Sequence, residues 1–448
     1  MQENTIIAVA SGIGGAISTL RLSGDKSIKI AEQFFSSKNS TPLSLRKPFS
    51  LHFGNIIDRK GEIIDEVLLS MFKAPASYTG EDMIEISCHA SSYITGRIIE
   101  EALALGARTA DPGEFTLRAY SNGKLDLVQA EGVADLISTT NATTHRLAMN
   151  QMRGGYSQEF TELRKKLVHF MSMIELELDF GEEDVEFADR TKLKELLFII
   201  KNKIDSLTAS FKNGNALKNG VPVAIVGKPN VGKSTLLNAL LNEEKAIVSD
   251  IAGTTRDIIE DTKTIGGVTF RFIDTAGIRN SDDTLEAIGI ERTFDRLHKA
   301  HVILLIVDNI ENINTQITEL QLTNDQELII IINKCDLHED LDTSSLSHSC
   351  FNISAKNHVG IDKLEAHLSE MYGNAQNEVI ITNARHWELL SLSLEGINRA
   401  IEGLDNGIPT DFIAQDLRES LHHLGSLTGE ITSDTILHSI FSSFCIGK

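Results

Sequence analysis

One eight-residue segment, Gly227–Ser234, constrains the fold of this chain most, because it has the spacing G-x-x-x-x-G-K-S of a phosphate-binding loop. The apolar run Val223–Val226 before it predicts a buried strand, and Thr235–Leu241 after it predicts the start of a helix. In that setting backbone N–H groups surround the phosphates, Lys233 neutralises them and the Ser234 hydroxyl ligates Mg²⁺. Such a spacing can arise by chance, so the interpretation depends on the segments that follow.

Two segments downstream predict a site for Mg²⁺ and the γ-phosphate. In Gly253–Asp257, Thr255 can reach Mg²⁺ when a γ-phosphate is present. The strand-like run Val268–Ile273 leads into Asp274–Gly277, which places a carboxylate beside the metal and a flexible glycine under the γ-phosphate.

Two further segments select the base. Leu328–Ile332 is followed by Asn333-Lys334-Cys335-Asp336, and the Asp336 carboxylate can accept hydrogen bonds from N1–H and the exocyclic amine of guanine. Adenine lacks that pair of donors, and leaving the carboxylate unpaired is costly, so the site discriminates between bases. Ser354-Ala355-Lys356 can supply a backbone N–H to the guanine oxygen. Five segments in this order predict an enzyme that hydrolyses GTP.

Two departures from the Ras-like pattern bear on how hydrolysis is catalysed. Ile278 stands where Ras-type enzymes have a water-orienting glutamine, and Glu286 is the nearest candidate for that role, although an acidic run there is also typical of a solvated loop. Asn230, within the phosphate loop, carries a side-chain oxygen that could ligate a monovalent cation. Such a cation would stabilise transition-state charge in place of an arginine finger, but spacing alone leaves this open.

Length, charge and cysteine content limit the remaining possibilities. A chain of 448 residues is expected to form about three domains. Its net charge of −21 argues against an autonomous nucleic-acid binder with a broad basic face. Cys88, Cys335, Cys350 and Cys445 form no C-x-x-C pair, which favours neither a disulfide framework nor a zinc site. No signal peptide or membrane span is evident, so we expect a cytoplasmic protein with no membrane association.

The order of patterns along the chain predicts a GTPase inserted into a helical domain. Short strand-like runs and the helical run Ser91–Leu105 predict an α/β domain over residues 1–118. A helical pattern then predicts the first part of an all-α domain over 119–217. The GTPase domain is expected over 218–375, with the polar run Lys212–Gly220 as a linker into it. Residues 376–448 are helical again and complete the all-α domain.

The C-terminal segment Phe444–Lys448 is the second distinctive feature. Cys445 stands four residues from the end, but Gly447 and Lys448 fit a prenylation signal poorly and no polybasic run precedes them. A terminal tail is normally frayed. The run Ile436–Phe444 is apolar enough to dock and carry Cys445 inward, where the cysteine could equally be a small hydrophobe. Composition does not decide between these alternatives.

Segments along the whole chain resemble the bacterial tRNA-modifying GTPase family MnmE, also called TrmE. Besides Gly253–Asp257 they are Thr79–Asp82, Pro112–Phe115, Lys124–Leu127 and Phe444–Lys448. The resemblance implies a multidomain fold with an α/β N-terminal folate-binding domain, a discontinuous all-α helical domain and an inserted Ras-like P-loop α/β GTPase domain.

The resemblance also implies a biochemical role. Family members act with MnmG, a partner that uses FAD and NADH, to add an aminomethyl or carboxymethylaminomethyl group to C5 of the wobble uridine, U34, of certain tRNAs. It further implies a homodimer formed by N-terminal domains that bind 5-formyl-tetrahydrofolate or a related one-carbon tetrahydrofolate. The GTPase domains are expected to dimerise on K⁺ and GTP, as a K⁺-stimulated GTPase requires.

Site residues follow from the motifs and, position by position, from the resemblance. Glu286 and Cys445 are the expected catalytic residues; Ser234 and Thr255 are expected to hold Mg²⁺, and Asn230, Ser249, Ile251 and Thr254 to hold K⁺. The folate contacts implied by the resemblance are Arg21, Glu85, Lys124 and Lys448. The expected GTP-binding residues are Asn230, Val231, Gly232, Lys233, Ser234, Thr235, Ser249, Asp250, Ile251, Ala252, Gly253, Thr254, Thr255, Asp274, Thr275, Ala276, Gly277, Asn333, Lys334, Asp336, Ser354, Ala355 and Lys356.

Two other classes of GTPase share the nucleotide segments. A ribosome-assembly GTPase usually carries a basic RNA-binding domain after the GTPase domain, whereas residues 376–448 hold ten acidic and four basic side chains, a net charge of −6. A purely regulatory GTPase would need neither a folate pocket nor a terminal cysteine.

Overall fold

The protein is described by a computed structural model, which covers residues 4–12, 14–38, 41–179, 190–241, 261–273, 297, 299–309, 313–323, 326–337, 346–373, 379–442 and 444–447. The chain divides into two compact units. Unit 1 comprises Met1–Ser138, Met149–Val185 and Leu417–Lys448, and unit 2 comprises Thr139–Ala148 and Glu186–Asp416. No helix in these described ranges is long and apolar enough to cross a membrane.

Unit 1 contains a seven-stranded sheet with the strand order β3-β4-β5-β6-β2-β1-β7. All neighbouring strands are antiparallel except β1 and β7, which run parallel. The strands are β1 (Ile6–Val9), β2 (Ile17–Ser23), β3 (Phe35–Ser36), β4 (Ser50–Ile57), β5 (Ile63–Phe72), β6 (Met83–His89) and β7 (Arg108–Thr109).

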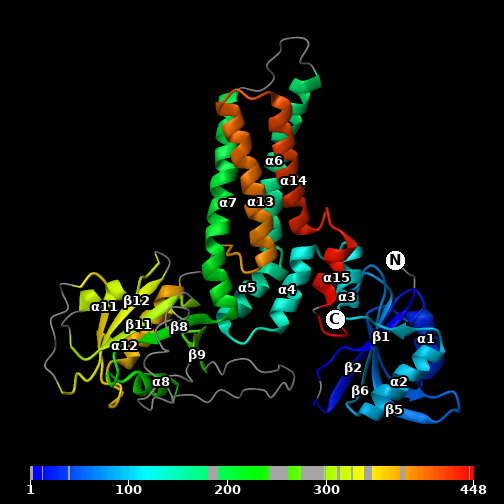
Figure 1. Cartoon of the computed structure of the whole chain (residues 1–448). Helices are drawn as coiled ribbons and strands as arrows, with labels where there is room; N and C mark the ends of the chain where they lie inside the picture. Colours follow the sequence, from blue (N-terminus) through cyan, green and yellow to red (C-terminus); the bar gives the residue numbers. More distant parts are fainter. Residues whose placement is uncertain are drawn as a thin grey trace. The chain divides into compact units, whose positions relative to one another are not determined.

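Two helices, α1 (Ser27–Phe34) and α2 (Ser92–Ala104), lie beside this sheet (Figure 1). Both contribute buried side chains to its core. Leu20, Leu22, Ile84 and Ile86 are fully buried there, because alternate residues of β2 and β6 point to the same face. The strands expected at Ile6–Val9 and Ile17–Leu22 and the helix expected at Ser91–Leu105 are confirmed within one or two residues.

Helices form much of the remaining described part of unit 1. One of them, α4, begins with a capping box, in which the Asp126 carboxylate accepts from the Gln129 N–H at 2.8 Å and the Gln129 side chain accepts from the Asp126 N–H at 3.0 Å. The Lys124–Leu127 segment is therefore the start of a helix. The residues of α5 and α14 are divided between the two units. The helices are α3 (Glu114–Ser121), α4 (Leu127–Ile137), α5 (Ala142–Met152), α6 (Gly155–Asp179), α14 (Thr410–Thr428) and α15 (Asp434–Ser442).

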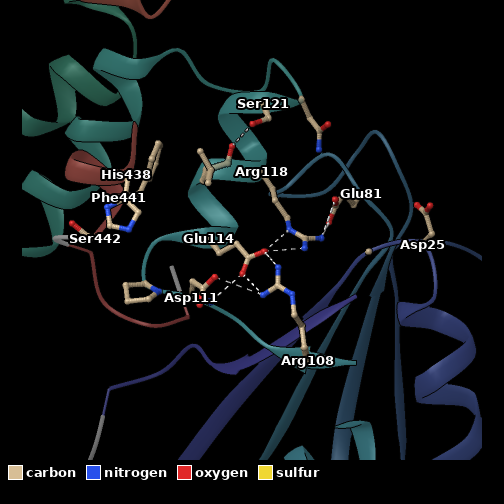
Figure 2. Close-up of a pocket in the computed structure, with 14 residues that line it drawn as sticks. Asp25, Glu81, Arg108, Asp111, Glu114, Arg118, Ser121, His438, Phe441 and Ser442 are labelled. Atoms are coloured by element: carbon tan, nitrogen blue, oxygen red, sulfur yellow. Dashed lines mark hydrogen bonds and ion pairs between the residues drawn. The ribbon is translucent and has the colours of Figure 1, made fainter. Parts of the chain in front are cut away.

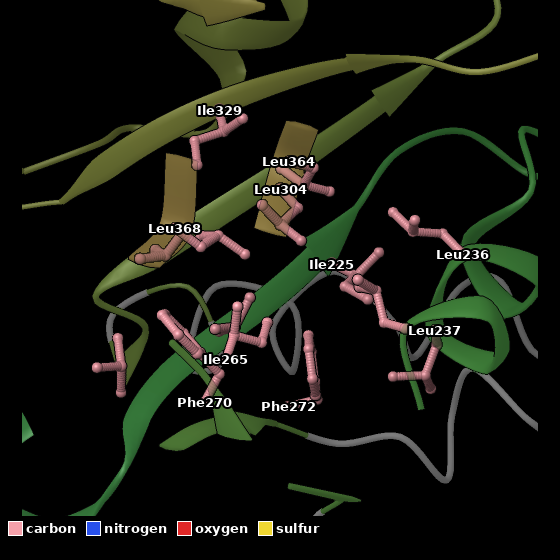
Figure 3. Packing of buried hydrophobic residues seen from close by; sticks show 14 of the residues in the cluster. Ile225, Leu236, Leu237, Ile265, Phe270, Phe272, Leu304, Ile329, Leu364 and Leu368 are labelled. Carbon is pink, nitrogen blue, oxygen red and sulfur yellow. The ribbon is translucent and has the colours of Figure 1, made fainter. Parts of the chain in front are cut away.

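Unit 2 is built around a six-stranded sheet of order β13-β12-β11-β8-β10-β9, parallel except for the edge strand β9. Every residue of β11 is buried, as expected for a central strand covered on both faces. Figure 3 shows the packing on one face, where Leu236, Leu237, Leu364 and Leu368 meet the sheet. The elements are β8 (Val221–Val226), α8 (Lys233–Leu241), β9 (Asp261–Ile265), β10 (Val268–Phe272), β11 (Val302–Val307), α11 (Ile313–Glu319), β12 (Glu327–Ile332), β13 (Ser349–Asn352) and α12 (Ile361–Gly373).

The prediction of a linker at Lys212–Gly220 is wrong. Helix α7 (Arg190–Asn219) continues to the residue before Gly220, and β8 begins at Val221. Helix α13 (Ala384–Asp405) runs alongside α7 (Figure 1). Tertiary packing overrides the polar composition, because Ala216 and Leu217 are buried in the same hydrophobic cluster as β8. The α7 helix is therefore joined to the six-stranded sheet through a shared core.

Candidate functional site

The phosphate-binding loop connects β8 to α8, and β8 lies between β11 and β10 in the sheet. Its neighbours are reached by crossovers in opposite directions, so the loop leaves the carboxyl end of β8 at a topological switch point, where ligands of such sheets bind. Gly227, Asn230 and Gly232 have φ values of 150°, 65° and 103°. A Cβ on Gly232 would lie 2.2 Å from the Asn333 amide nitrogen, so only glycine allows this close approach.

The Lys233 ammonium folds back over the loop that carries it. It donates to the carbonyls of Gly227 and Lys228, each at 2.8 Å. Burial lowers the pKa of Lys233 from its ordinary value. Ser234 and Thr235 lie in the first turn of α8, where backbone N–H groups and the helix dipole favour an anion. The loop thus has the charge and the geometry to hold phosphate groups.

The side chain of Asn333 joins three of the predicted nucleotide segments. Its amide nitrogen donates to the Val231 carbonyl at 2.8 Å, and its amide oxygen accepts from the Ala355 N–H at 3.0 Å. Asn333 is 4% exposed, so these bonds form away from solvent. The phosphate loop and the two base-selecting segments are therefore held together at the carboxyl ends of β8, β12 and β13.

Of the groups predicted to bind the base, some are exposed and others form contacts within the protein. The nearby Ser354 hydroxyl, and then the positive charge of Lys356, hold the pKa of the exposed Asp336 carboxyl below its ordinary value. Asp336 thus stays ionised as an acceptor at neutral pH. The Ser354 N–H donates to the Val359 carbonyl at 3.0 Å, and Lys334 pairs with Asp308 at 3.6 Å.

The remaining predicted members of this site lie outside the described residues. These are Glu286 and the segments Ser249–Thr255 and Asp274–Gly277, which include the predicted Mg²⁺ ligand Thr255 and the predicted K⁺ ligands Ser249, Ile251 and Thr254. Their roles stay predictions. Ile273, the last described residue before Asp274, is tied to β8 by its N–H, which donates to the Val223 carbonyl at 3.0 Å.

In unit 1 the strand register brings Arg21 and Glu85 together. They are directly opposite each other on β2 and β6, and the Arg21 guanidinium donates twice to one Glu85 carboxylate oxygen, at 2.9 and 2.7 Å. The same guanidinium lies 5.0 Å from the centroid of the Tyr78 ring and 5.6 Å from that of Phe115. This arrangement combines a fixed charged pair with two aromatic surfaces.

Lys124 contacts the segment that carries Tyr78. Its ammonium donates to the Pro75 carbonyl at 3.1 Å, and the Tyr78 hydroxyl is 2.9 Å from that of Thr116. Burial raises the pKa of Tyr78, which keeps its hydroxyl neutral. The fourth predicted folate contact, Lys448, lies outside the described residues.

The C-terminal tail docks on the N-terminal part of unit 1. Phe441 and Phe444 are buried in a cluster with Leu127 and Ala130, and Ile446 forms an antiparallel bridge with Pro112. The Gly113 N–H donates to the Cys445 carbonyl at 3.4 Å. Cys445 itself is exposed, so the tail is docked as one alternative supposed, but the thiol is not carried inward.

Beside the tail lies a cavity of about 590 Å³ whose walls the sequence did not indicate (Figure 2). On one side the Glu114 carboxylate accepts from both Arg108 and Arg118, and Arg118 also donates to Glu81. Burial acts to raise the pKa of Glu114, but the hydrogen bonds from Arg108 and Asp111 outweigh it and lower the pKa. The sequence signals for this network were the Thr79–Asp82 segment, which contains Glu81, and the Pro112–Phe115 segment, whose Gly113 is the N-cap of α3.

Sequence comparisons match the whole chain. The family model described as "GTP-binding protein TrmE N-terminus" matches residues 5–124, and that described as "MnmE helical domain" matches residues 127–445. The chain is 51% identical to the tRNA modification GTPase MnmE of Bacteroides thetaiotaomicron and 48% identical to that of Flavobacterium johnsoniae. Each alignment covers 100% of this chain and 100% of the relative. These matches confirm the predicted multidomain fold class.

The position of Asp336 predicts its effect on base choice. In Asp336→Asn the acceptor pair is lost, so we expect GTP to bind about tenfold or more weakly. Xanthosine triphosphate should bind better, because its exocyclic carbonyl can accept from the new amide. Fluorescence titration with both nucleotides measures the change, and Asp362→Asn, at an exposed carboxylate on α12, is the matched control. An unaltered preference for GTP in Asp336→Asn would reject the assignment.

Proposed function

Because the chain belongs to the MnmE family of tRNA modification GTPases, we propose that it couples GTP hydrolysis to modification of tRNA at C5 of the wobble uridine U34. The product carries an aminomethyl or carboxymethylaminomethyl group. This proposal rests on the two hydrogen bonds of the Asn333 side chain, which hold the phosphate loop and both base-selecting segments together. The chain that forms them aligns with these relatives from end to end.

Nucleoside analysis of total tRNA tests the function directly. Cells that lack the protein should lose the modified wobble uridine, and the wild-type gene should restore it. Asp336→Asn should restore it only in part, because the variant binds cellular GTP poorly. Full modification in the cells that lack the protein would overturn the proposal, whatever the GTPase activity of the purified chain.

Each nucleotide-site residue has a role in the proposed reaction. Lys233 leaves the Gly227 and Lys228 carbonyls and moves its ammonium to the β- and γ-phosphates. Ser234 and Thr255 would hold Mg²⁺, which would neutralise charge on the phosphates, and Asp274 would supply a carboxylate to the same site. Glu286 orients the attacking water. The Ser354–Lys356 segment supplies a backbone N–H to the guanine oxygen.

A potassium ion is proposed beside the phosphates, where it stabilises charge that develops in the transition state. Asn230 fits a ligand role because it is exposed in the loop and its left-handed backbone directs the chain around the phosphate position. Ser249, Ile251 and Thr254 complete the proposed site. An ion held there would stabilise the face-to-face dimer of GTPase domains.

This role for Asn230 predicts that hydrolysis depends on the cation. An arginine finger contributes about 10³–10⁵-fold, so we expect GTP hydrolysis to be about tenfold or more faster in K⁺ than in Na⁺ at equal ionic strength. Asn230→Ala should remove most of that difference. Steady-state phosphate release in the two salts provides the measurement, with Asn314→Ala on α11 as the matched surface control. Equal wild-type rates in the two salts would eliminate the potassium site.

A one-carbon tetrahydrofolate such as 5-formyl-tetrahydrofolate is proposed to bind beside β2 and β6, where it would supply the added carbon. The residues there fit its chemistry: Glu85, hydrogen-bonded to Arg21, can accept from the pterin ring, and Tyr78 and Phe115 offer aromatic surface. Lys124 and Lys448 suit the anionic glutamate tail. This proposal requires the C-terminal segment to lie against the N-terminal part of the chain. The docking of the tail there supports it.

The proposed partners follow from the same chemistry. We propose a homodimer formed through the N-terminal domain, residues 1–118. The proposed helical domain comprises residues 119–217 and 376–448, and the proposed GTPase domain comprises residues 218–375. A MnmG-type flavoprotein that carries FAD and uses NADH would supply the redox step in a complex with this chain. Cys445 is proposed to act in the modification step, since its exposed thiol is not needed for packing.

Two changes in the tail separate a chemical role of Cys445 from docking. Cys445→Ser should keep folate affinity and GTP hydrolysis but lower tRNA modification by about tenfold or more, because packing involves Phe441 and Phe444 rather than the thiol. Deletion of Phe444–Lys448 should reduce both folate binding and modification while GTP hydrolysis persists. Titration calorimetry, a GTPase assay and tRNA nucleoside analysis give the three readouts. Full tRNA modification by Cys445→Ser would show that the thiol has no role in the modification step.

A further inference from the structure

A tight turn at Asp111–Glu114 leads from β7 into α3. The Glu114 N–H donates to the Asp111 carbonyl at 3.2 Å, and the Glu114 carboxylate accepts from the Asp111 N–H at 3.0 Å. Arg108 and Arg118 also donate to this carboxylate, at 2.7 and 3.0 Å. The backbone of the turn is therefore fixed by a network of charged side chains.

Gly113, within this turn, is in direct contact with the segment that leads into the C-terminal tail. Its φ is 67°, in the left-handed region that favours glycine. A Cβ at this position would lie 2.6 Å from the Phe441 carbonyl oxygen and 3.0 Å from the Phe444 Cβ. A Cβ cannot come so close to a backbone oxygen, so a side chain on residue 113 would displace the tail from the start of α3.

A second glycine makes a similar contact on the other side of Cys445. Gly447 is buried and has a φ of 98°. A Cβ there would lie 2.9 Å from the carbonyl carbon of Val9 and 3.1 Å from the Cα of Ala10. The tail therefore packs closely against the N-terminal part of unit 1 both before and after the cysteine.

The main chain between these two contacts is also held. The Cys445 carbonyl accepts from the Gly113 N–H at 3.4 Å, and Ile446 forms an antiparallel bridge with Pro112. The Cys445 side chain is nonetheless exposed. A free chain end samples many positions, whereas this one fixes the backbone of its cysteine and leaves the thiol accessible.

We propose that Gly113 and Gly447 are positioning residues for Cys445: their close contacts hold the tail so that the thiol stays at one place near the start of α3. This inference rests on the proposed function, which gives Cys445 a role in tRNA modification. Misplacing a reacting group by about 1 Å can slow a reaction about 100-fold. A side chain at either glycine should therefore slow modification without touching the thiol.

Matched glycine substitutions test the contacts themselves. Gly113→Ala adds the Cβ that meets the tail. Its control is Gly407→Ala, at an exposed glycine with a φ of 65° and no atom within 4 Å of a Cβ placed on it, so that only the backbone strain is introduced. Gly106→Ala, with a φ of 98° and the same free space, is the control for Gly447→Ala. Hydrogen exchange at the Phe444–Gly447 amides, followed by mass spectrometry, should be about tenfold or more faster in the two test variants and unchanged in the controls.

The rate of tRNA modification at saturating folate tests the functional consequence. Gly113→Ala should lower kcat about tenfold or more with little change in KM for tRNA, while GTP hydrolysis persists. In the Cys445→Ser background the same change should have no further effect, because both substitutions disable one thiol. Effects that multiply in the double variant would show that Gly113 does not act through Cys445.

The results separate this inference from the proposed function. Suppose that the wild-type protein, with its flavoprotein partner, modifies tRNA. The inference is then wrong, and the proposed function stands, if Gly113→Ala keeps the wild-type rate or if its tail amides exchange no faster than those of Gly407→Ala. Full modification by Cys445→Ser would overturn the inference as well. If the wild-type protein does not modify tRNA, both the inference and the proposed function are overturned.

Discussion

The side-chain amide of Asn333 is the interaction on which the nucleotide site depends. Parallel strands place their carboxyl ends at one edge of a sheet, but they do not fix the loops that follow. Asn333 does so by bonding to Val231 in one loop and to Ala355 in another while it sits in a third. Loss of either bond would leave a buried polar group unsatisfied, at a cost of about 1–3 kcal/mol. The site is therefore preorganised by one residue that need not touch the nucleotide.

Charge in this protein is organised locally rather than by its net value. The Glu114 carboxylate is almost buried, and such a group is tolerated only because Arg108 and Arg118 both donate to it. That network fixes the start of α3, against which the tail packs.

The sequence predicted elements best where one local rule decided the outcome. Continuous apolar runs such as Leu328–Ile332 became buried strands, and the glycine and lysine spacing located the loop after β8. The linker at Lys212–Gly220 failed because its polar residues hid Ala216 and Leu217, which only the folded sheet could show to be buried. Long-range contacts were equally invisible: the pairing of Arg21 with Glu85 depends on strand register, and the role of Asn333 depends on three separate loops.

The direct junction between α7 and β8 has a mechanical consequence for unit 2. Helix α7 has 30 residues, which corresponds to about 45 Å, and its last turns share a core with the sheet that binds the nucleotide. A flexible linker would absorb small displacements of the sheet, whereas a packed helix transmits them along its length. The Ile273 N–H, directly before the predicted γ-phosphate segment Asp274–Gly277, donates to the Val223 carbonyl of β8. A displacement of β8 can therefore reach α7 through their shared core.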